Sequence, residues 1–255
     1  MKRELTIATP CYNEAESLPE YFKRIESVRS ELVKSGWQCR LTLIDDGSFD
    51  QTAEMIKAYA ASHENTQTIH HPRNMGYGGA IKTALTTTET EWLIFVDADT
   101  NYHQNIALEL VKLASDDIDI INVSLLAPGG LQGYPWYRKI LSMGASGLYR
   151  VSMPRLTRGI YTMTCGFRMY RTAVAPQILP HIDNFAATTE SMLRALNAGL
   201  RIVEFPAKNE EREHGISKMR FVSNTLIHFK LVLRAWFCLL GEPETTASHL
   251  RRIGR

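Results

Sequence analysis

The chain has 255 residues with a net charge of +2, 44% hydrophobic and 22% charged residues, a composition ordinary for a globular protein with a sizeable core. So small an excess of positive charge argues against a dedicated nucleic-acid binder, which concentrates many more basic groups. No metal-ligand spacing or disulfide framework links the four cysteines, so we expect them to be reduced and mostly buried. Residues 1–5 lead straight into a strand pattern without an apolar signal region, which favours the cytoplasm.

Short β-rich runs, of which the first four are separated by helical patterns, predict a parallel α/β sheet; they cover residues 5–9, 40–44, 66–70, 92–96 and 118–123. Capping boxes at Ser17-Leu18-Pro19-Glu20 and Ser48-Phe49-Asp50-Gln51 predict the starts of the first two helices. Residues 127–160, rich in Gly, Pro and aromatic residues, break this rhythm and predict an inserted, partly helical segment.

The fourth run ends in two carboxylates, Asp97 and Asp99, which are spaced two residues apart. In an extended chain both side chains point the same way, at the edge of the sheet where α/β proteins bind ligands. Two adjacent carboxylates need a cation or a shared proton, and hard oxygen ligands suit Mg²⁺ or Mn²⁺ with a phosphorylated substrate. Taken alone, the pair is equally compatible with a solvated strand end.

Three more polar loops follow the other strands, at the same edge of the predicted sheet; their sequences are Pro10-Cys11-Tyr12-Asn13-Glu14, Asp45-Asp46-Gly47-Ser48 and Arg73-Asn74-Met75-Gly76-Tyr77-Gly78-Gly79-Ala80. The first lacks the glycine motif of a dinucleotide site, so a hydride-transfer enzyme is not expected. The second places acidic groups where a base or ribose would be bound, although alone it is equally a turn and a helix cap. The third resembles a phosphate-binding loop without the P-loop lysine, and alone it favours a glycine turn before a helix.

Together and in this order, the loops resemble those of the family-two nucleotide-sugar glycosyltransferases. Within that family the greatest similarity is to the dolichol-phosphate mannose synthases and related polyprenyl-phosphate glycosyltransferases, over about residues 5–219. Glu204-Phe205-Pro206 and then Arg212-Glu213-His214-Gly215-Ile216-Ser217-Lys218 match that branch's Glu-Val-Pro and Arg-x-x-Gly-x-Ser-Lys. The segment from Cys165 to Arg171 resembles its Ser-Gly-Phe-Arg segment, and Glu190 resembles its helix acid.

The resemblance implies a GT-A (nucleotide-diphospho-sugar transferase) fold over residues 1–219, with a central, mostly parallel sheet flanked by helices. It also implies an inverting, metal-dependent hexosyltransferase. In that enzyme Arg212 and Lys218 would neutralise the leaving diphosphate. Asp45 and Asp46 would bind the base and ribose of the donor. The metal ligands would be Asp97, Asp99 and Asn101, and the donor-binding residues Pro10, Tyr12, Glu14, Asp45, Asp46, Asn74, Gly76, Asp97, Ala98 and Asp99.

In this branch the acceptor is a lipid phosphate, which is already anionic and needs cations nearby rather than a base. The candidates are Arg168, which we expect to be catalytic, and Arg155 and Arg158. The chain departs from the branch here, because the branch usually reads Arg-Asp-x-x-Ser-Gly-Phe-Arg, whereas this chain has Tyr161 in place of the arginine and Cys165 in place of the serine, and the identity of the acceptor stays open. Arg168 has an alternative interpretation as an ordinary surface cation.

Two other functions fit the same loops. A family-two enzyme acting on a saccharide hydroxyl would need a general base, and Glu190 or Asp183 is the available acid. A non-catalytic nucleotide-sugar-binding protein is the other alternative, although retention of Asp97, Asp99, Arg212 and Lys218 speaks against it. The donor, whether GDP-mannose, UDP-glucose or another sugar, stays open in every case.

Residues 220–255 are expected to form an amphipathic membrane-interface helix and a tail. The segment 221–240 is apolar at most positions but carries His228, Lys230 and Arg234. Two permanent cations make it costly as a spanning helix, whereas a helix in the membrane interface would place Trp236 and Phe237 among headgroups. We therefore expect peripheral attachment to the inner face of the membrane. The alternative is a helix packed on the core or on a second copy of the chain.

Overall fold

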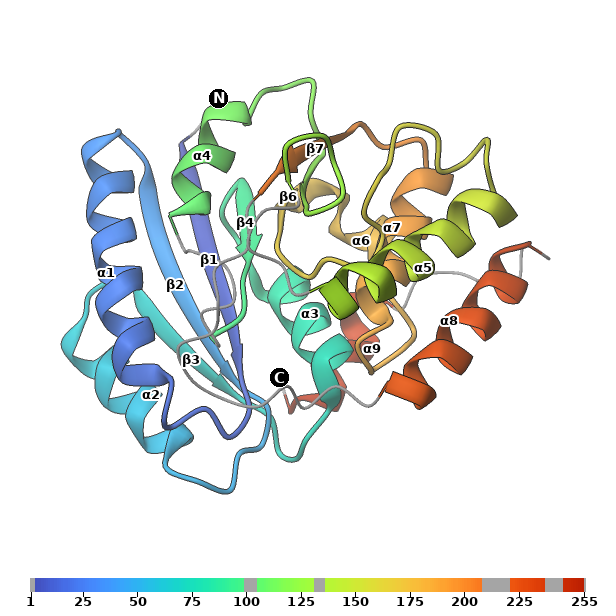
Figure 1. Ribbon diagram of the computed structural model, residues 1–255. Coiled ribbons are helices and arrows are strands. Elements are labelled where there is room, and N and C mark those ends of the chain that lie inside the picture. The colour runs from blue at the N-terminus through green and yellow to red at the C-terminus, as the bar shows by residue number, and fades with distance from the viewer. Residues whose placement is uncertain (1–2, 99–104, 131–135, 208–220, 237–244, 255) are drawn as a thin grey trace.

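The computed structural model describes residues 3–98, 105–130, 136–207, 221–236 and 245–254. Its centre is a sheet with the strand order β3-β2-β1-β4-β6-β5-β7 (Figure 1). The strands are β1 (Glu4–Cys11), β2 (Gln38–Asp45), β3 (Thr66–His70), β4 (Trp92–Phe95), β5 (Ile120–Ser124), β6 (Arg168–Arg171) and β7 (Ile202–Pro206). All pairings are parallel except those of β6, which runs antiparallel to β4 and β5.

Helices cover both faces of this sheet. One face packs against α1 (Leu18–Lys34), α2 (Thr52–Ser62) and α4 (Ile106–Leu113). The other packs against α3 (Gly76–Thr87), α6 (Ala175–Ile178) and α7 (Ala187–Asn197), with the short helix η1 (Thr172–Val174) before α6. Two long helices, α5 (Trp136–Ser152) and α8 (Phe221–Trp236), contact each other on the outer side of α7, and α9 (Thr246–Arg252) contacts α3 (Figure 1).

Alternation along the central strands explains why both faces are covered. In β4, Trp92 and Ile94 point into the α1 side of the core, whereas Leu93 and Phe95 point into the α3 side. A strand with apolar residues at every position is stable only where helices bury both of its faces. The five strands expected from such runs are confirmed as β1 to β5, and the expected inserted segment contains α5.

The structure confirms the predicted start of α1 and corrects that of α2. Helix α1 begins at Leu18 as expected, but the Ser17 hydroxyl bonds to Glu14 rather than to a helix amide. Helix α2 begins at Thr52, later than the Ser48 box predicted: its N-cap is Gln51, which makes no side-chain capping bond, and the Asp50 carboxylate accepts the Thr52 amide at 3.0 Å. Ser48 is thereby left in the loop.

Candidate active site

The first two polar loops are hydrogen-bonded to each other at the carboxyl ends of β1 and β2. The Asn13 amide donates to Ser48 Oγ at 3.1 Å, and the Phe49 amide donates to Asn13 Oδ1 at 3.0 Å. Asn13 has a φ of 53°, a left-handed conformation that asparagine tolerates better than most residues. The Glu14 amide donates to Thr52 Oγ1 at 2.9 Å. These bonds fix the backbone of both loops.

The two acidic residues at the carboxyl end of β2, Asp45 and Asp46, are buried and make different bonds. Asp45 Oδ1 accepts the Ser48 amide at 3.0 Å, which closes the turn. Asp46 Oδ1 accepts the Met75 amide at 2.8 Å and contacts Nδ1 of the buried His71 at 2.6 Å. A buried carboxylate stays charged only where such donors replace water. Asp46 therefore joins the second loop to the third, and His71 is a site residue that the sequence did not single out.

The third loop packs against its neighbours through glycines. Gly47 has a φ of +71°, and a Cβ there would lie 2.5 Å from the Arg73 carbonyl carbon. Gly76 has a φ of +75°, and a Cβ there would overlap the carbonyl oxygen of Asp183. Larger residues would push the loops apart. A fifth segment, around Asp183, thus lies against the third loop, while Asn74 is exposed at the edge.

Asp97 follows β4 and accepts the Tyr77 hydroxyl at 2.7 Å. The Tyr77 ring packs against Phe95 and Phe185, at centroid distances of 5.6 and 5.0 Å. Burial, and then the charge of Asp97, raises the pKa of Tyr77 well above its ordinary value, so this hydroxyl stays a donor. A Cβ on Gly166 would overlap the Tyr77 hydroxyl, which explains the glycine of the Cys-Gly-Phe-Arg segment.

Several predicted residues fall outside the described part of the chain, namely Asp99, Asn101, Arg212 and Lys218. The described residues contain no cluster of three His, Cys, Asp or Glu side chains suited to a metal. Asp97 contributes one carboxylate, and the donor set predicted with it, a second carboxylate and an amide, fits a hard cation such as Mg²⁺ or Mn²⁺.

Arg168, at the start of β6, is buried, so its interpretation as a surface cation is wrong. Its Nε donates to Asn122 Oδ1 at 2.8 Å and its Nη2 to the Met163 carbonyl at 2.9 Å, while Nη1 donates to the Thr188 carbonyl. These bonds tie the segment before β6 to β5 and α7. Contact between Arg168 and an acceptor stays a prediction.

The remaining motif acids also make internal bonds. Glu204 on β7 accepts the amides of Tyr161 and Thr162 at 2.8 and 2.9 Å, which fixes the segment before the Gly-Phe-Arg turn. Glu190, buried on α7, pairs with Arg194 at 2.7 Å and accepts the amides of His181 and Ile182. Both carboxylates therefore have structural partners in this fold.

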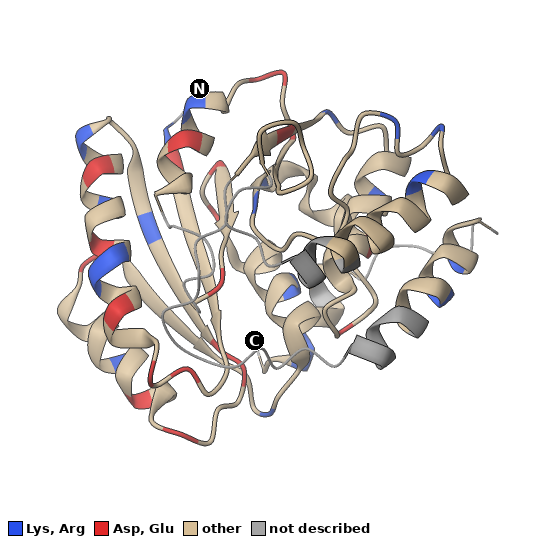
Figure 2. Cartoon of the chain, in the orientation of Figure 1, with Lys and Arg blue, Asp and Glu red and all other residues tan. Residues whose placement is uncertain are grey.

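Helix α8 packs with Leu231 and Val232 buried in the cluster it shares with α5 and α7. Its Phe229 and Trp236 side chains are 51% and 64% exposed, and Lys230 and Arg234 are exposed beside them. Neither α5 nor α8 contains an acidic residue, and Figure 2 shows both marked by basic residues alone. Among the described residues, no helix combines the length and hydropathy needed to cross a membrane.

Comparison with known proteins decides the family. The model of the family described as Glycosyl transferase family 2 matches residues 6–179. The chain belongs to that family. This family-two chain is 29% identical to polyprenol monophosphomannose synthase of Mycolicibacterium smegmatis over 226 residues, which cover 84% of this chain and 80% of that protein.

Other relatives are longer. Dolichol-phosphate mannosyltransferase of Pyrococcus furiosus is 24% identical over 218 residues, covering 85% of this chain and 59% of that protein. Glycosyltransferase AglD of Haloferax volcanii is 26% identical over 247 residues, covering 95% of this chain but only 38% of its own length. The crystal structure of glucosyl-3-phosphoglycerate synthase from Mycobacterium tuberculosis aligns with a TM-score of 0.65 at 18% identity, covering 95% of this chain and 81% of that one. This likeness confirms the predicted GT-A fold.

Proposed function

We propose that this family-two glycosyltransferase moves a hexose, with inversion, from a nucleotide-diphosphate sugar to a polyprenyl phosphate at the inner face of the cytoplasmic membrane. One observation carries the proposal. Acidic loops converge at the carboxyl ends of β1, β2 and β4, while the helices α5 and α8 carry basic and exposed apolar residues but no acid. The relatives named as polyprenol and dolichol-phosphate transferases support the same acceptor class.

In this proposal the loop carboxylates bind the donor. Asp46 is fixed by His71 and the Met75 amide through Oδ1, which leaves Oδ2 for a hydroxyl or base amine of the nucleotide. Asp97, Asp99 and Asn101 would bind Mg²⁺ or Mn²⁺, and the related crystal structures with UDP and Mn²⁺ or Mg²⁺ support this ion. When bound, the ion would supply Lewis-acid stabilisation of the diphosphate. Arg212 and Lys218 would meet the charge that grows as the diphosphate leaves.

The interactions of the two candidate bases, Glu190 and Asp183, favour a phosphate acceptor over a saccharide hydroxyl. A hydroxyl must lose its proton to a base, whereas a lipid phosphate is already anionic. Glu190 is buried in an ion pair with Arg194, and Asp183 pairs with Lys82 at 2.6 Å and Arg252 at 2.8 Å. Although burial opposes it, bonding to Arg252 and Lys82 lowers the pKa of Asp183 and makes it a weak base, and the Glu190 carboxylate is already bonded to Arg194 and two amides. Catalysis would then consist of bringing donor and acceptor together in line.

A transfer assay tests the acceptor. The full chain is incubated with Mn²⁺ and labelled GDP-mannose or UDP-glucose, and with a polyprenyl phosphate, the matching polyprenol or a soluble oligosaccharide. We expect label only in the polyprenyl phosphate sample. Label in the oligosaccharide would establish the hydroxyl-acceptor alternative, and nucleotide-sugar binding without any transfer would establish a binding protein.

The membrane part of the proposal rests on the exposed side of α8. Phe229 and Trp236 would enter the headgroup region, where full burial of a large apolar side chain contributes about 1.5–3 kcal/mol. Lys230 and Arg234 would add about 1 kcal/mol each near anionic lipids. Such attachment is reversible and should weaken as salt is raised.

Flotation with anionic liposomes tests this attachment. Deleting α8 is a poor test, because Leu231 and Val232 belong to the core. The double variant Phe229→Ser/Trp236→Ser alters exposed positions only and should leave most of the protein in the soluble fraction. Val33→Ser, at an apolar position on α1 that is 59% exposed, is the control and should float like the parent. Equal flotation of all three proteins would refute attachment through α8.

A further inference from the structure

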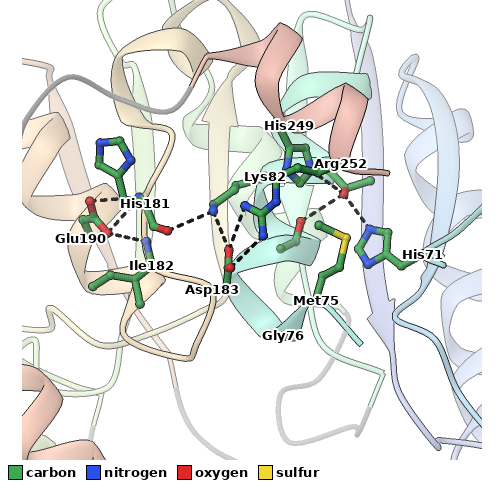
Figure 3. Close-up of polar contacts among 12 residues, drawn as sticks. His71, Met75, Gly76, Lys82, His181, Ile182, Asp183, Glu190, His249 and Arg252 are labelled. Atoms are coloured by element: carbon green, nitrogen blue, oxygen red, sulfur yellow. Dashed lines mark hydrogen bonds and ion pairs between the residues drawn. The ribbon is translucent and has the colours of Figure 1, made fainter. Parts of the chain in front are cut away.

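The last helix, α9, is bonded to the donor side of the fold although it is remote in sequence. His249 is fully buried, and its Nε2 lies 2.8 Å from Oγ1 of Thr83 on α3. Arg252 pairs with Asp183 at 2.8 Å. The proposed chemistry uses neither α9 residue, and both contacts lead to the loops at the proposed donor site (Figure 3).

The first connection runs through α3 to Asp46. Thr83 Oγ1 contacts His249 on one side and Nε2 of His71 on the other, each at 2.8 Å. His71 Nδ1 then contacts Asp46 Oδ1 at 2.6 Å. Figure 3 shows the imidazole rings of His71 and His249 near each other, although the two residues come from distant parts of the chain. Asp46, His71, Thr83 and His249 are all buried, so water cannot replace a missing member freely.

The donors and acceptors in this row of four residues determine the direction of its hydrogen bonds. The Asp46 carboxylate only accepts, so His71 Nδ1 must carry a proton. In the neutral form of His71, Nε2 accepts the single hydroxyl proton of Thr83, which leaves the threonine oxygen to accept a proton from His249 Nε2. Without His249, Thr83 is free to turn its hydroxyl toward its other acceptor, the Gly79 carbonyl at 3.1 Å. His249 thus favours the arrangement in which His71 points at Asp46.

The second connection runs through Asp183 to the loop that leads into α3. The Asp183 side chain lies between Arg252 and the buried Lys82, at 2.8 and 2.6 Å (Figure 3). Its carbonyl oxygen accepts the Gly78 amide at 2.7 Å and lies where a Cβ of Gly76 would be. Arg252 therefore fixes the segment that packs directly on the first turn of α3, where Gly76 is expected to bind the donor.

We infer that α9 is a positioning element of the donor site, in which His249 orients Asp46 through Thr83 and His71, and Arg252 orients the Gly76–Gly78 turn through Asp183. This inference rests on the proposed function, since it requires that Asp46 and this turn bind the nucleotide. It predicts that two residues near the end of the chain set the affinity for the donor without touching it.

The test measures nucleotide affinity and kinetics in the full chain. We expect His249→Leu and Arg252→Ala each to raise the Kd for the matching nucleoside diphosphate, UDP or GDP with Mn²⁺, and the KM for the donor by about tenfold, as for residues that orient ligand-binding groups. The turnover number and the KM for the acceptor should change by less than about twofold. His249→Gln keeps a donor near the position of Nε2, and Arg252→Lys keeps the charge, so both should restore most of the affinity. Arg251→Ala, on the same helix and exposed, is the control.

The outcomes separate three cases. Thermal midpoints that fall while donor Kd and KM stay unchanged would show that α9 is a packing element, and would overturn the inference. If His249→Leu does not fold, the comparison of Arg252→Ala with Arg252→Lys, at an exposed position, tests the inference in the same way. An unmodified chain that binds no nucleoside diphosphate in the presence of Mn²⁺ would refute the proposed function, and this inference with it.

Discussion

Replacing Tyr77 with phenylalanine should weaken donor binding while leaving the fold intact. The variant removes one hydroxyl, whose bond to Asp97 Oδ1 is 2.7 Å long. The ring would keep its contacts with Phe95 and Phe185, which lie at centroid distances of 5.6 and 5.0 Å. Asp97 would lose a donor that fixes its orientation at the end of β4.

The magnitude follows from the type of bond. A hydrogen bond to a charged group contributes about 1.5–3 kcal/mol, and Asp97 is partly exposed, so water would replace part of it. We therefore expect a loss of about 1–2 kcal/mol, which corresponds to about 5–30-fold in donor Kd or in kcat/KM. Because burial and Asp97 raise the pKa of Tyr77, the hydroxyl stays protonated, and the loss should not vary between about pH 6 and pH 9.

Calorimetry with a nucleoside diphosphate and Mn²⁺, beside steady-state kinetics, measures this loss. Tyr59→Phe is the matched control, since it removes a tyrosine–carboxylate bond of 2.8 Å to Glu26 on the α1–α2 side. A double-mutant cycle with Asp97→Asn should give a coupling energy of about 1–2 kcal/mol. If Tyr77→Phe costs no more affinity than Tyr59→Phe, or the coupling is zero, Tyr77 does not act through Asp97.

Further expectations concern catalysis and stability. Asp99→Ala should abolish transfer with an unchanged thermal midpoint, and activity within about tenfold of the parent would refute the metal assignment. Arg212→Ala and Lys218→Ala should lower kcat more than they raise the donor KM, whereas a higher KM at constant kcat would indicate ground-state binding only. Hydrogen bonds from Arg201 hold the pKa of Asp119 below its ordinary value, so their contribution to stability is present above about pH 4 and is lost as the pH falls through the lowered pKa. Asp119→Asn should therefore flatten the acid side of a plot of urea midpoint against pH.

The sheet could be predicted because its signal is local. In β1 and β4, buried residues occupy consecutive positions, and only a strand covered on both faces accommodates such a run. The start of α2 was harder, because Ser48 and Asp50 both have side chains that can cap a helix and only the tertiary structure selects between them. Ser48 accepts the Asn13 amide from the first loop, and it is Asp50 that accepts the amide of Thr52, the first residue of the helix.

The candidate site was predictable as a set of loops but not as a set of bonds. Asp46 and Asp97 were expected from their places after strands, whereas the partners that orient them, His71 and Tyr77, were not. A single buried histidine or tyrosine has no spacing pattern to reveal it. The contact between Thr83 and His249 joins residues 166 positions apart, and only the folded chain brings them together.

The polar groups that bond to Asp45 and Asp46 meet one physical requirement. Asp45 and Asp46 are buried next to each other, so each must receive donors from the protein to remain ionised. The groups that bond to them are the amides of Ser48 and Met75, the His71 ring at 2.6 Å and the His70 ring at 3.4 Å. Bonds of this kind fix the orientation of both carboxylates before a ligand arrives. Carboxylates that are oriented before the ligand arrives suit the hydroxyl groups of a ribose and a divalent cation. Binding of these ligands then requires little rearrangement of the protein.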